Sequence, residues 1–508
     1  MIKEHSMGEK FDSSHFKLRK LRKHKPPTRF SRLLEKGGLA TNYGVRKIQD
    51  YMVMEGNNNL IFGSYKGTPI GVCHDNRYSN RNWNTFVLAG ETDKGWKYHT
   101  LPNLLAMHSS AVIVEKPERY TGYLSELQKN GCNLFLVDFS NRTETQVPKS
   151  HYNPFVHFWE SKADKSNSYE RHIMYLTDTA ASLFHKERDK QCAAHGYMLD
   201  SESLALSVWR DLLRTAFEYV GMSDNVNHSE RNFKTVKAIL HDIEKNGKRA
   251  VNKYLLPQTS SVKPVFDETD EEMFSAMLSA LIDDLAPLTE CNTFIEGSDT
   301  LNINAQKLVE EQSYLFIPNS DLEANNKRTG FLLAMLSKEL YNYGECNWRY
   351  TNQALSRHFQ FYLGEFENYK FPNFSFYLAT CRKYGIGYSI ISQGIPRIKE
   401  AYAKGNEWEL IIGNTDTTIG YALEEDEDVK FLQKYAEYRV NTDGKEIPEW
   451  KQIRERKRWE GKAVNFSLRY ACGLTSEQLH TLFEKENRAF ICIRCYAPIL
   501  SDPLKTIG

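Results

Sequence analysis

The chain has 508 residues, enough for two or three domains with sizeable cores. Its 66 basic and 65 acidic residues nearly cancel, which excludes a global positive field that would attract nucleic acid. Nine scattered cysteines indicate reduced thiols, and the 15 histidines show no metal-binding spacing, so we expect no metal site. No apolar run approaches the ~20 residues that span a bilayer. We therefore expect a cytoplasmic globular protein with no intrinsic transmembrane segment.

The first 36 residues form a candidate basic arm. A dense cluster of cations is closed there by Pro26 and Pro27. Such a cluster is suited to phosphates, either of nucleic acid or of an anionic membrane surface. A membrane surface would place the protein at the inner face of the cell membrane. The alternative is a solvated arm without a partner. The candidate anion-binding residues are Lys17, Arg19, Lys20, Arg22, Lys23 and Lys25.

Residues 37–160 show the pattern of an α/β domain. Short apolar runs and turn residues first predict a small β-rich opening section. Continuously apolar runs then alternate with a helical pattern, which is typical of strands and helices that build a parallel sheet. The expected elements are strands at 86–89, 111–114 and 133–138, and a helix at 120–129.

The pattern changes twice more along the chain. Residues 161–300 lack strand signals and predict an all-helical domain, with helices at 201–220, 233–255 and 271–285. Residues 301–508 return to the α/β pattern. We expect strands at 314–317, 359–363, 388–391, 410–412 and 418–421, helices at 330–341 and 374–384, and a solvated acidic loop at 424–428.

The segment after the first buried strand has the layout of a phosphate-binding loop. In the motif G-x-x-x-x-G-K-[ST], the loop begins at a strand end and leads into a helix. Gly90 and Gly95 have this spacing, but Trp96 and Lys97 stand where the motif has lysine and serine or threonine. Thr92 and Lys94 complete the candidate nucleotide-binding loop. The glycines are present, whereas the phosphate-binding cation is missing.

Several blocks, in this order, resemble the TraG/TraD-type coupling proteins of type IV secretion and conjugation. The resembling blocks are residues 86–105, 152–155, 363–374, 379–385, 392–393 and 408–418. The resemblance extends from about Gly37 to the C-terminus. It implies a RecA-like P-loop NTPase-type parallel sheet with an inserted all-helical domain. It also implies a hexamer that uses ATP and Mg²⁺ to drive DNA translocation.

The departures from the family fall on catalytic positions. The phosphate-loop lysine aligns with Trp96, and the magnesium-binding aspartate of the Walker B strand aligns with Gly364. Losing both should remove most of the electrostatic stabilisation that phosphoryl transfer requires. The resemblance nevertheless assigns Glu365 to the water-activating glutamate, Arg382 to an arginine that reaches the neighbouring subunit, and Gln393 to the γ-phosphate sensor. These three groups are either catalytic or vestigial.

Three functions fit the sequence. The first is a degenerate coupling protein, a pseudo-ATPase that acts as a scaffold or recruits DNA or protein substrates, with no cofactor. Its partners would be secretion or relaxosome proteins, or an intact paralogue in a mixed ring. The second is an active divergent ATPase that uses Lys94 or Lys97. The third is a stand-alone nucleic-acid-binding or regulatory protein.

Overall fold

The computed structural model describes residues 59–438 apart from 66–67, 74–82, 91, 107–108, 141–142, 156–167, 187–198, 257–262, 296–302, 352–354 and 424, and it describes 479, 483, 488–493 and 499–501. The predicted basic arm lies outside the described residues. No described helix is long and apolar enough to cross a membrane.

Among the described residues, nine strands form one sheet in the order β11-β10-β9-β3-β8-β7-β4-β6-β5. All pairings from β9 to β5 are parallel, and β10 runs antiparallel to both β9 and β11. Their bounds are β3 Thr85–Ala89, β4 Ser110–Glu115, β5 Asn133–Leu136, β6 Ser313–Pro318, β7 Phe359–Leu363, β8 Ile386–Ser392, β9 Thr417–Tyr421, β10 Ala489–Ile493 and β11 Ile499–Ser501. A separate antiparallel hairpin joins β1 (Asn59–Tyr65) to β2 (Thr68–Cys73).

Helices cover both faces of the sheet, which explains why its strands are continuously apolar. In β3, Phe86 and Leu88 belong to one apolar cluster and Val87 and Ala89 to another. The first cluster contains residues of α16 (Glu323–Thr351) and α17 (Phe374–Thr380). The second contains residues of η3 (Trp96–Thr100), α4 (Leu101–Ala106), α5 (Pro117–Tyr120) and α6 (Leu124–Lys129). Helix α3 (Thr92–Gly95) leads directly into η3, and η4 (Thr121–Tyr123) joins α5 to α6. The predicted parallel-sheet fold is confirmed.

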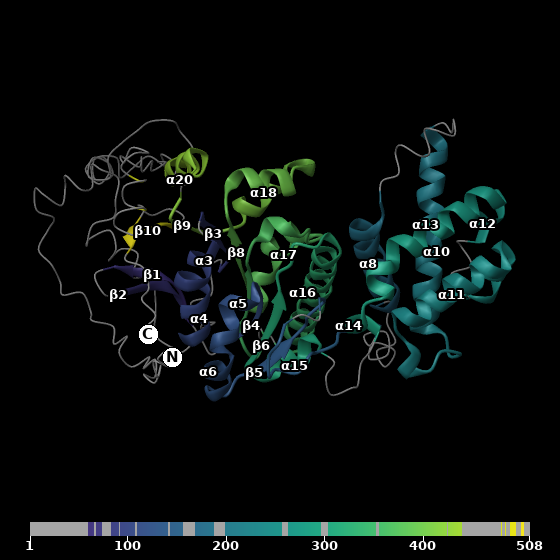
Figure 1. Cartoon of the computed structure of the whole chain (residues 1–508), viewed down its shortest axis with the longest axis horizontal. Helices are drawn as coiled ribbons and strands as arrows, with labels where there is room; N and C mark the ends of the chain where they lie inside the picture. The colour runs from purple at the N-terminus through teal and green to yellow at the C-terminus, as the bar shows by residue number, and fades with distance from the viewer. Residues whose placement is uncertain are drawn as a thin grey trace, which may run out of the picture.

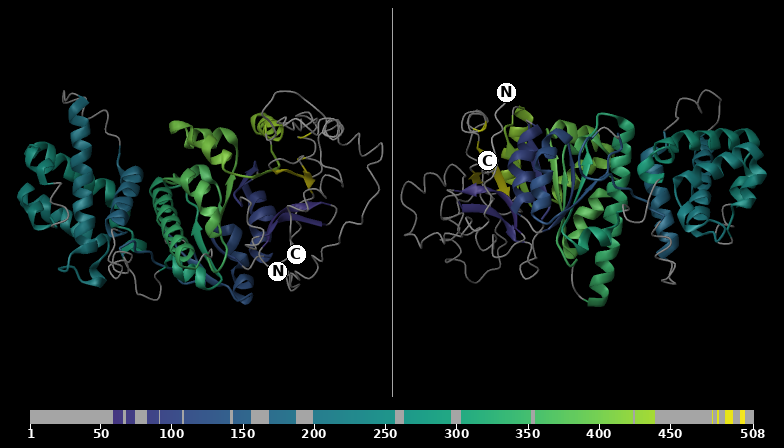
Figure 2. Two further views of the ribbon diagram at one scale, coloured as in Figure 1. Left: turned by 180° about the vertical axis from the view of Figure 1, so that it is seen from behind. Right: turned by 60° about the horizontal axis from the view of Figure 1, so that its bottom comes forward.

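An all-helical part lies at one end of the molecule (Figures 1 and 2). It consists of α8 (Ser168–Phe184), α10 (Leu199–Met222), η5 (His228–Glu230), α11 (Phe233–Asn246), η6 (Lys248–Lys253), α12 (Lys263–Glu268), α13 (Glu271–Thr289) and α14 (Asn292–Ile295). The single helix expected over 233–255 is wrong, because Gly247 has a φ of 73° and separates α11 from η6.

One buried carboxylate on α16 holds both connections between the sheet and the helical part. Glu339 is 5% exposed; it accepts a hydrogen bond from the Tyr152 hydroxyl and, through Oε2, another from the backbone N–H of Ala305 at 2.9 Å. The two connections also bond to each other, since the N–H of Ile303 donates to the carbonyl of His151 at 2.9 Å. Ala305 begins α15 (Ala305–Glu310). The Tyr-Asn-Pro-Phe motif at 152–155 therefore lies at the crossing point.

Two further expectations about the C-terminal part are wrong. The strand expected at 410–412 lies within a helix, α19 (Glu407–Gly413), because Ile411 and Ile412 are buried on one helical face. The loop expected at 424–428 is wrong from Asp426 on, where α20 (Asp426–Tyr438) begins; residues 425–427 are exposed, but Asp428 is 1% exposed. The Asp428 carboxylate accepts the N–H of Ile395 at 2.7 Å. The remaining elements are η8 (Phe366–Asn368), η9 (Cys381–Tyr384), α18 (Ile395–Ala401) and η10 (Lys404–Asn406).

Candidate functional site

The loop after β3 is replaced almost entirely by helix. Helix α3 begins at Thr92, so only Gly90 and Glu91 separate it from the strand. Gly95, the second glycine of the motif, has ordinary helical angles (φ −59°, ψ −45°). A Cβ atom there would lie 2.7 Å from Cγ2 of Ile391 on β8. This glycine is therefore explained by close packing of the helix on the sheet, rather than by an approach to phosphate.

The side chain at the lysine position of the motif belongs to the core. Trp96 is 4% exposed and packs in the apolar cluster that also contains Val87 and Ala89, with its ring centroid 6.4 Å from that of Tyr123. It opens a π-helical turn in which the N–H of Leu101 bonds to the Trp96 carbonyl. Trp96 thus contributes apolar burial and no positive charge.

The two lysines of this segment lie in different surroundings. Lys97 is exposed, with its Nζ 5.5 Å from the ring centroid of its neighbour Tyr98. Lys94 is half-buried in α3, and Asp93 beside it is exposed. Their use as replacement phosphate ligands remains a prediction.

The ends of β4 and β7 approach each other so closely that only glycine fits at the Walker B position. The N–H of Gly364 donates to the Val114 carbonyl at 3.0 Å. A Cβ at position 364 would lie 2.6 Å from that carbonyl oxygen and 3.1 Å from Oε2 of Glu115. The carboxylate of Glu115 thus borders the space that an aspartate at 364 would need.

The neighbouring Glu365 is fully engaged by other side chains. It is 5% exposed, and its backbone is left-handed, with a φ of 47°. Its Oε2 accepts hydrogen bonds from the amides of Asn319 at 3.0 Å and Asn368 at 3.1 Å. Its Oε1 lies 2.9 Å from Nζ of Lys116, as an ion pair without hydrogen-bond geometry, and 3.8 Å from Nη2 of Arg119. Two amides thus hold Oε2, and two cations face Oε1.

A second ion pair completes the cluster. Glu115 is 2% exposed, and its Oε1 accepts from Nη1 of Arg119 at 2.6 Å and from the N–H of Lys116 at 2.9 Å. Burial raises the pKa of Glu115 to about 7, although the Arg119 guanidinium lowers it. Arg119 therefore lies between the carboxylates of Glu115 and Glu365.

These residues do not fit a magnesium ion. Mg²⁺ is held by carboxylates that remain free to coordinate it. Here the carboxylates of Glu115 and Glu365 are paired with the cations of Lys116 and Arg119. Gly364 stands where the family has its magnesium-binding aspartate and offers no carboxylate. Among the described residues, no group of three or more His, Cys, Asp or Glu side chains is arranged to hold a metal ion. The arrangement favours a closed structural cluster over phosphoryl-transfer chemistry.

A side chain at position 364 is therefore expected to destabilise the protein. Gly364→Ala should lower the free energy of unfolding by about 2 kcal/mol, because its Cβ would overlap the Val114 carbonyl. Thermal denaturation measures the loss. Gly413→Ala is the matched control, since a Cβ at that helical glycine meets no atom within 4 Å. Equal stability of the two variants would contradict the close approach of β4 and β7.

Residues 358–460 match the sequence profile described as the TraM recognition site of TraD and TraG. Their described portion spans β7, β8 and β9, including the Walker B position. This part of the chain is similar to the C-terminal region of the TraG/TraD-type coupling proteins.

Solved structures share the fold of this chain. The bacterial conjugative coupling protein TrwBdeltaN70 in its unbound form matches with a TM-score of 0.56 and 11% identity, over 91% of this chain and 92% of that chain. Its complex with sulphate gives a TM-score of 0.55 at 11% identity, over 92% and 94% of the two chains. TrwB with ADP and Mg²⁺ gives 0.54 at 11% identity, over 91% and 92%. No curated protein matches the chain by sequence.

The family residues that follow the Walker B strand lie at opposite ends of β8. Gln393 follows the carboxyl end of β8, and its N–H donates to Oε1 of Glu367 at 3.0 Å. Arg382 lies in η9, before the amino end of the same strand, and is half-buried. The structure thus brings Gly364, Glu365 and Gln393 to one edge of the sheet and leaves Arg382 at the other. Their catalytic roles remain predictions.

Sequence reasoning missed a chain of buried polar side chains that crosses the middle of the sheet. Nε2 of His358 lies 3.2 Å from Oε1 of Gln360, whose Nε2 donates to Oγ of Ser389 at 3.0 Å. That hydroxyl lies 3.0 Å from Nε2 of His99. The donors and acceptors are consistent if His358 donates and Ser389 donates to His99. The available signal was a polar residue inside each of two apolar strands, at Gln360 and Ser389.

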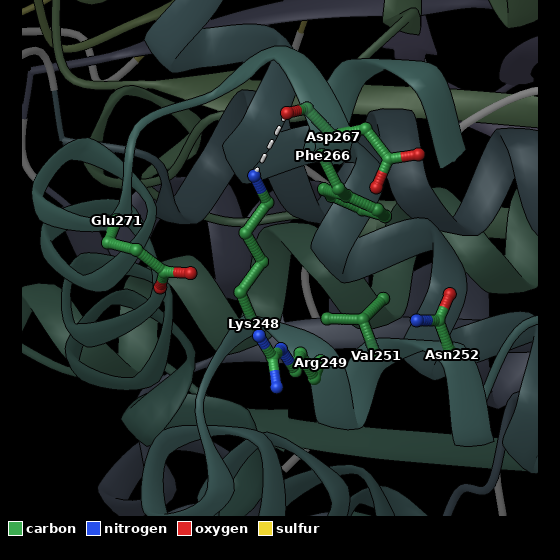
Figure 3. A pocket seen from close by; sticks show the side chains of 7 residues that line it. All are labelled: Lys248, Arg249, Val251, Asn252, Phe266, Asp267 and Glu271. Atoms are coloured by element: carbon green, nitrogen blue, oxygen red, sulfur yellow. Dashed lines mark hydrogen bonds between the residues drawn. The ribbon is translucent and has the colours of Figure 1, made fainter.

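A polar hollow of about 200 Å³ lies in the helical part, away from the strand ends (Figure 3). Its lining residues include the apolar Val251 and Phe266 and the charged Lys248 and Glu271. The Lys248 ammonium donates to the carbonyls of Asp267 at 3.2 Å and Thr269 at 2.6 Å. Lys248 thus links η6 to the end of α12 by hydrogen bonds. We interpret the hollow as a gap between these packed helices.

Proposed function

We propose that this chain is a coupling-protein homologue that works in conjugative DNA transfer without hydrolysing ATP, as a scaffold or as a recruiter of DNA or protein substrates. One observation carries the proposal. At the strand ends where the family places its nucleotide, Glu365 is engaged by Lys116, Arg119 and two amides. The burial of Trp96 at the lysine position supports the same conclusion.

Backbone groups at the same edge are also engaged by internal carboxylates. Glu115 accepts the N–H of Lys116, Glu367 accepts that of Gln393, and Asp428 accepts that of Ile395. Backbone N–H groups beyond strand ends are the donors that hold phosphates in nucleotide-binding folds. Here these donors already bind anions that belong to the protein.

The proposed partners follow from the matched profile. Its description as the TraM recognition site supports a relaxosome protein as the binding partner of residues 358–460. A mixed ring with an intact paralogue would supply ATP hydrolysis from the neighbouring subunits. In that arrangement Arg382, a half-buried and permanently charged group, would serve as a subunit contact.

Nucleotide binding tests the proposal. A ligand at 100 times its Kd stabilises a protein by about 2.7 kcal/mol, so thermal denaturation with MgATP in the millimolar range is a sensitive assay. We expect no shift of the melting temperature and no phosphate release, with or without DNA. An intact coupling protein measured in parallel is the positive control.

Magnesium-dependent binding together with DNA-stimulated turnover would contradict the proposal. Two variants then identify the replacement cation. Turnover that is lost in Lys97→Ala or in Lys94→Ala would establish the divergent ATPase instead. Turnover that both variants retain would assign the phosphate contacts to another cation.

A further inference from the structure

The ends of β4 and β7 carry a cluster in which charges cancel inside the protein. Glu115 and Glu365 are 2% and 5% exposed, and Lys116 and Arg119 lie against them. Buried carboxylates are costly unless cations or hydrogen bonds compensate them. Asn319 and Asn368 donate hydrogen bonds to Glu365, so four residues from three segments of the chain (116–119, 319 and 368) contribute to its environment.

The geometry of this cluster differs from that of an incidental surface salt bridge. Arg119 reaches both carboxylates, with Nη1 2.6 Å from Glu115 and Nη2 3.8 Å from Glu365. Its side chain is only 13% exposed, whereas surface pairs are well solvated and contribute little. Glu365 also keeps a left-handed backbone, which is unfavourable for a non-glycine residue. Such a conformation persists only where surrounding contacts determine it.

We propose that Lys116 and Arg119 are built-in counter-ions that take the place of a divalent cation between β4 and β7. The inference rests on the proposed loss of nucleotide chemistry at this site. It adds that two side-chain cations occupy the place of the metal ion. Two carboxylates that approach one arginine would, without the cations, form an oxygen-lined site of the kind that hard divalent ions bind. Lysine and arginine supply the two positive charges that such an ion would bring.

This role predicts that metal dependence appears when the two cations are removed. The variant Lys116→Ala/Arg119→Ala should melt about 5 °C below the wild type at pH 8 in EDTA, because two buried carboxylates lose their partners. Mn²⁺ at roughly 10 mM should restore at least half of that loss, whereas the wild-type melting temperature should move by less than about 1 °C.

A matched control is available in the helical part. Arg214 pairs with Glu218 at 2.7 Å, with side chains 29% and 3% exposed. Burial raises the pKa of Asp211 and the Arg214 charge opposes this rise, but among the described residues Arg214 makes ion-pair contact with Glu218 alone. Arg214→Ala should therefore lose stability without recovering it in Mn²⁺. Recovery of both variants to the same extent would show a general salt effect and would overturn the proposal.

If the double variant does not fold, Lys116→Ala alone keeps the inference testable. The Lys116 side chain is 39% exposed, so this variant should remain folded. Electron paramagnetic resonance should show at least fivefold tighter Mn²⁺ binding than in the wild type, at one ion per chain. Unchanged affinity, or a double variant that is as stable as the wild type, would overturn the counter-ion role. No measurement includes nucleotide, so MgATP binding by the wild type would overturn the proposed function separately.

Discussion

Replacing Trp96 by lysine, the residue of the phosphate-loop motif, will destabilise the protein by about 4 kcal/mol and will not restore nucleotide binding. Trp96 is 4% exposed among apolar residues, so the substitution removes a large core side chain and places an unpaired ammonium there. Helix α3 also occupies the length of chain that would wrap around phosphates. Thermal denaturation measures the first effect, and MgATP titration measures the second.

Two control variants separate burial from charge. Trp96→Phe keeps an aromatic ring in the cluster and should lose much less stability than Trp96→Lys. Lys97→Ala removes a cation from an exposed position and should change the free energy of unfolding by no more than about 0.5 kcal/mol. The prediction would be contradicted if Trp96→Lys had the melting temperature of the wild type and bound MgATP. A single lysine would then be enough to restore phosphate binding by the loop.

The fold could be predicted because its signals are local. The strands at 359–363 and 388–391 are mostly apolar, with one small or amide polar residue in each, and the structure places both inside the parallel sheet, as β7 and within β8. The helix expected over 374–384 forms as α17 followed by η9. Residues 410–412 were assigned wrongly because three apolar residues cannot distinguish a buried strand from one face of a short helix.

The candidate site was only partly predictable. The missing charges at Trp96 and Gly364 are visible in the sequence, but their replacements are not. Glu115 and Glu365 are 250 positions apart, and only the pairing of β4 with β7 brings them together. Gly95 shows the same limit, because its fit to a phosphate motif and its contact with Ile391 are indistinguishable until the helix is placed on the sheet.

Two buried histidines contribute a part of the stability that is lost in mild acid. His99 and His358 are 0% and 6% exposed, and burial lowers the pKa of each to about 3. In the unfolded chain their pKa is about 6.5, so the unfolded state binds protons more readily. Their contribution to stability is therefore complete above pH 6.5 and is lost as the pH falls towards 3. At pH 5 each should cost about 2 kcal/mol, or about 4 kcal/mol together.

Denaturation of the wild type and of His99→Gln/His358→Gln between pH 8 and 5 measures this contribution. The slopes must be compared rather than the absolute stabilities, because both substitutions disturb the buried polar chain. Burial raises the pKa of Glu115 to about 7 and that of Asp428 to about 6, so these carboxyls favour the folded state as the pH falls and oppose the histidines. The carboxyl gains offset the histidine losses in the wild type, so its stability should change little from pH 8 to 5, whereas the double variant should gain about 4 kcal/mol relative to the wild type. Parallel pH profiles of the two proteins would contradict the lowered pKa of His99 and His358, because the histidines would then bind protons equally well in the folded and unfolded states.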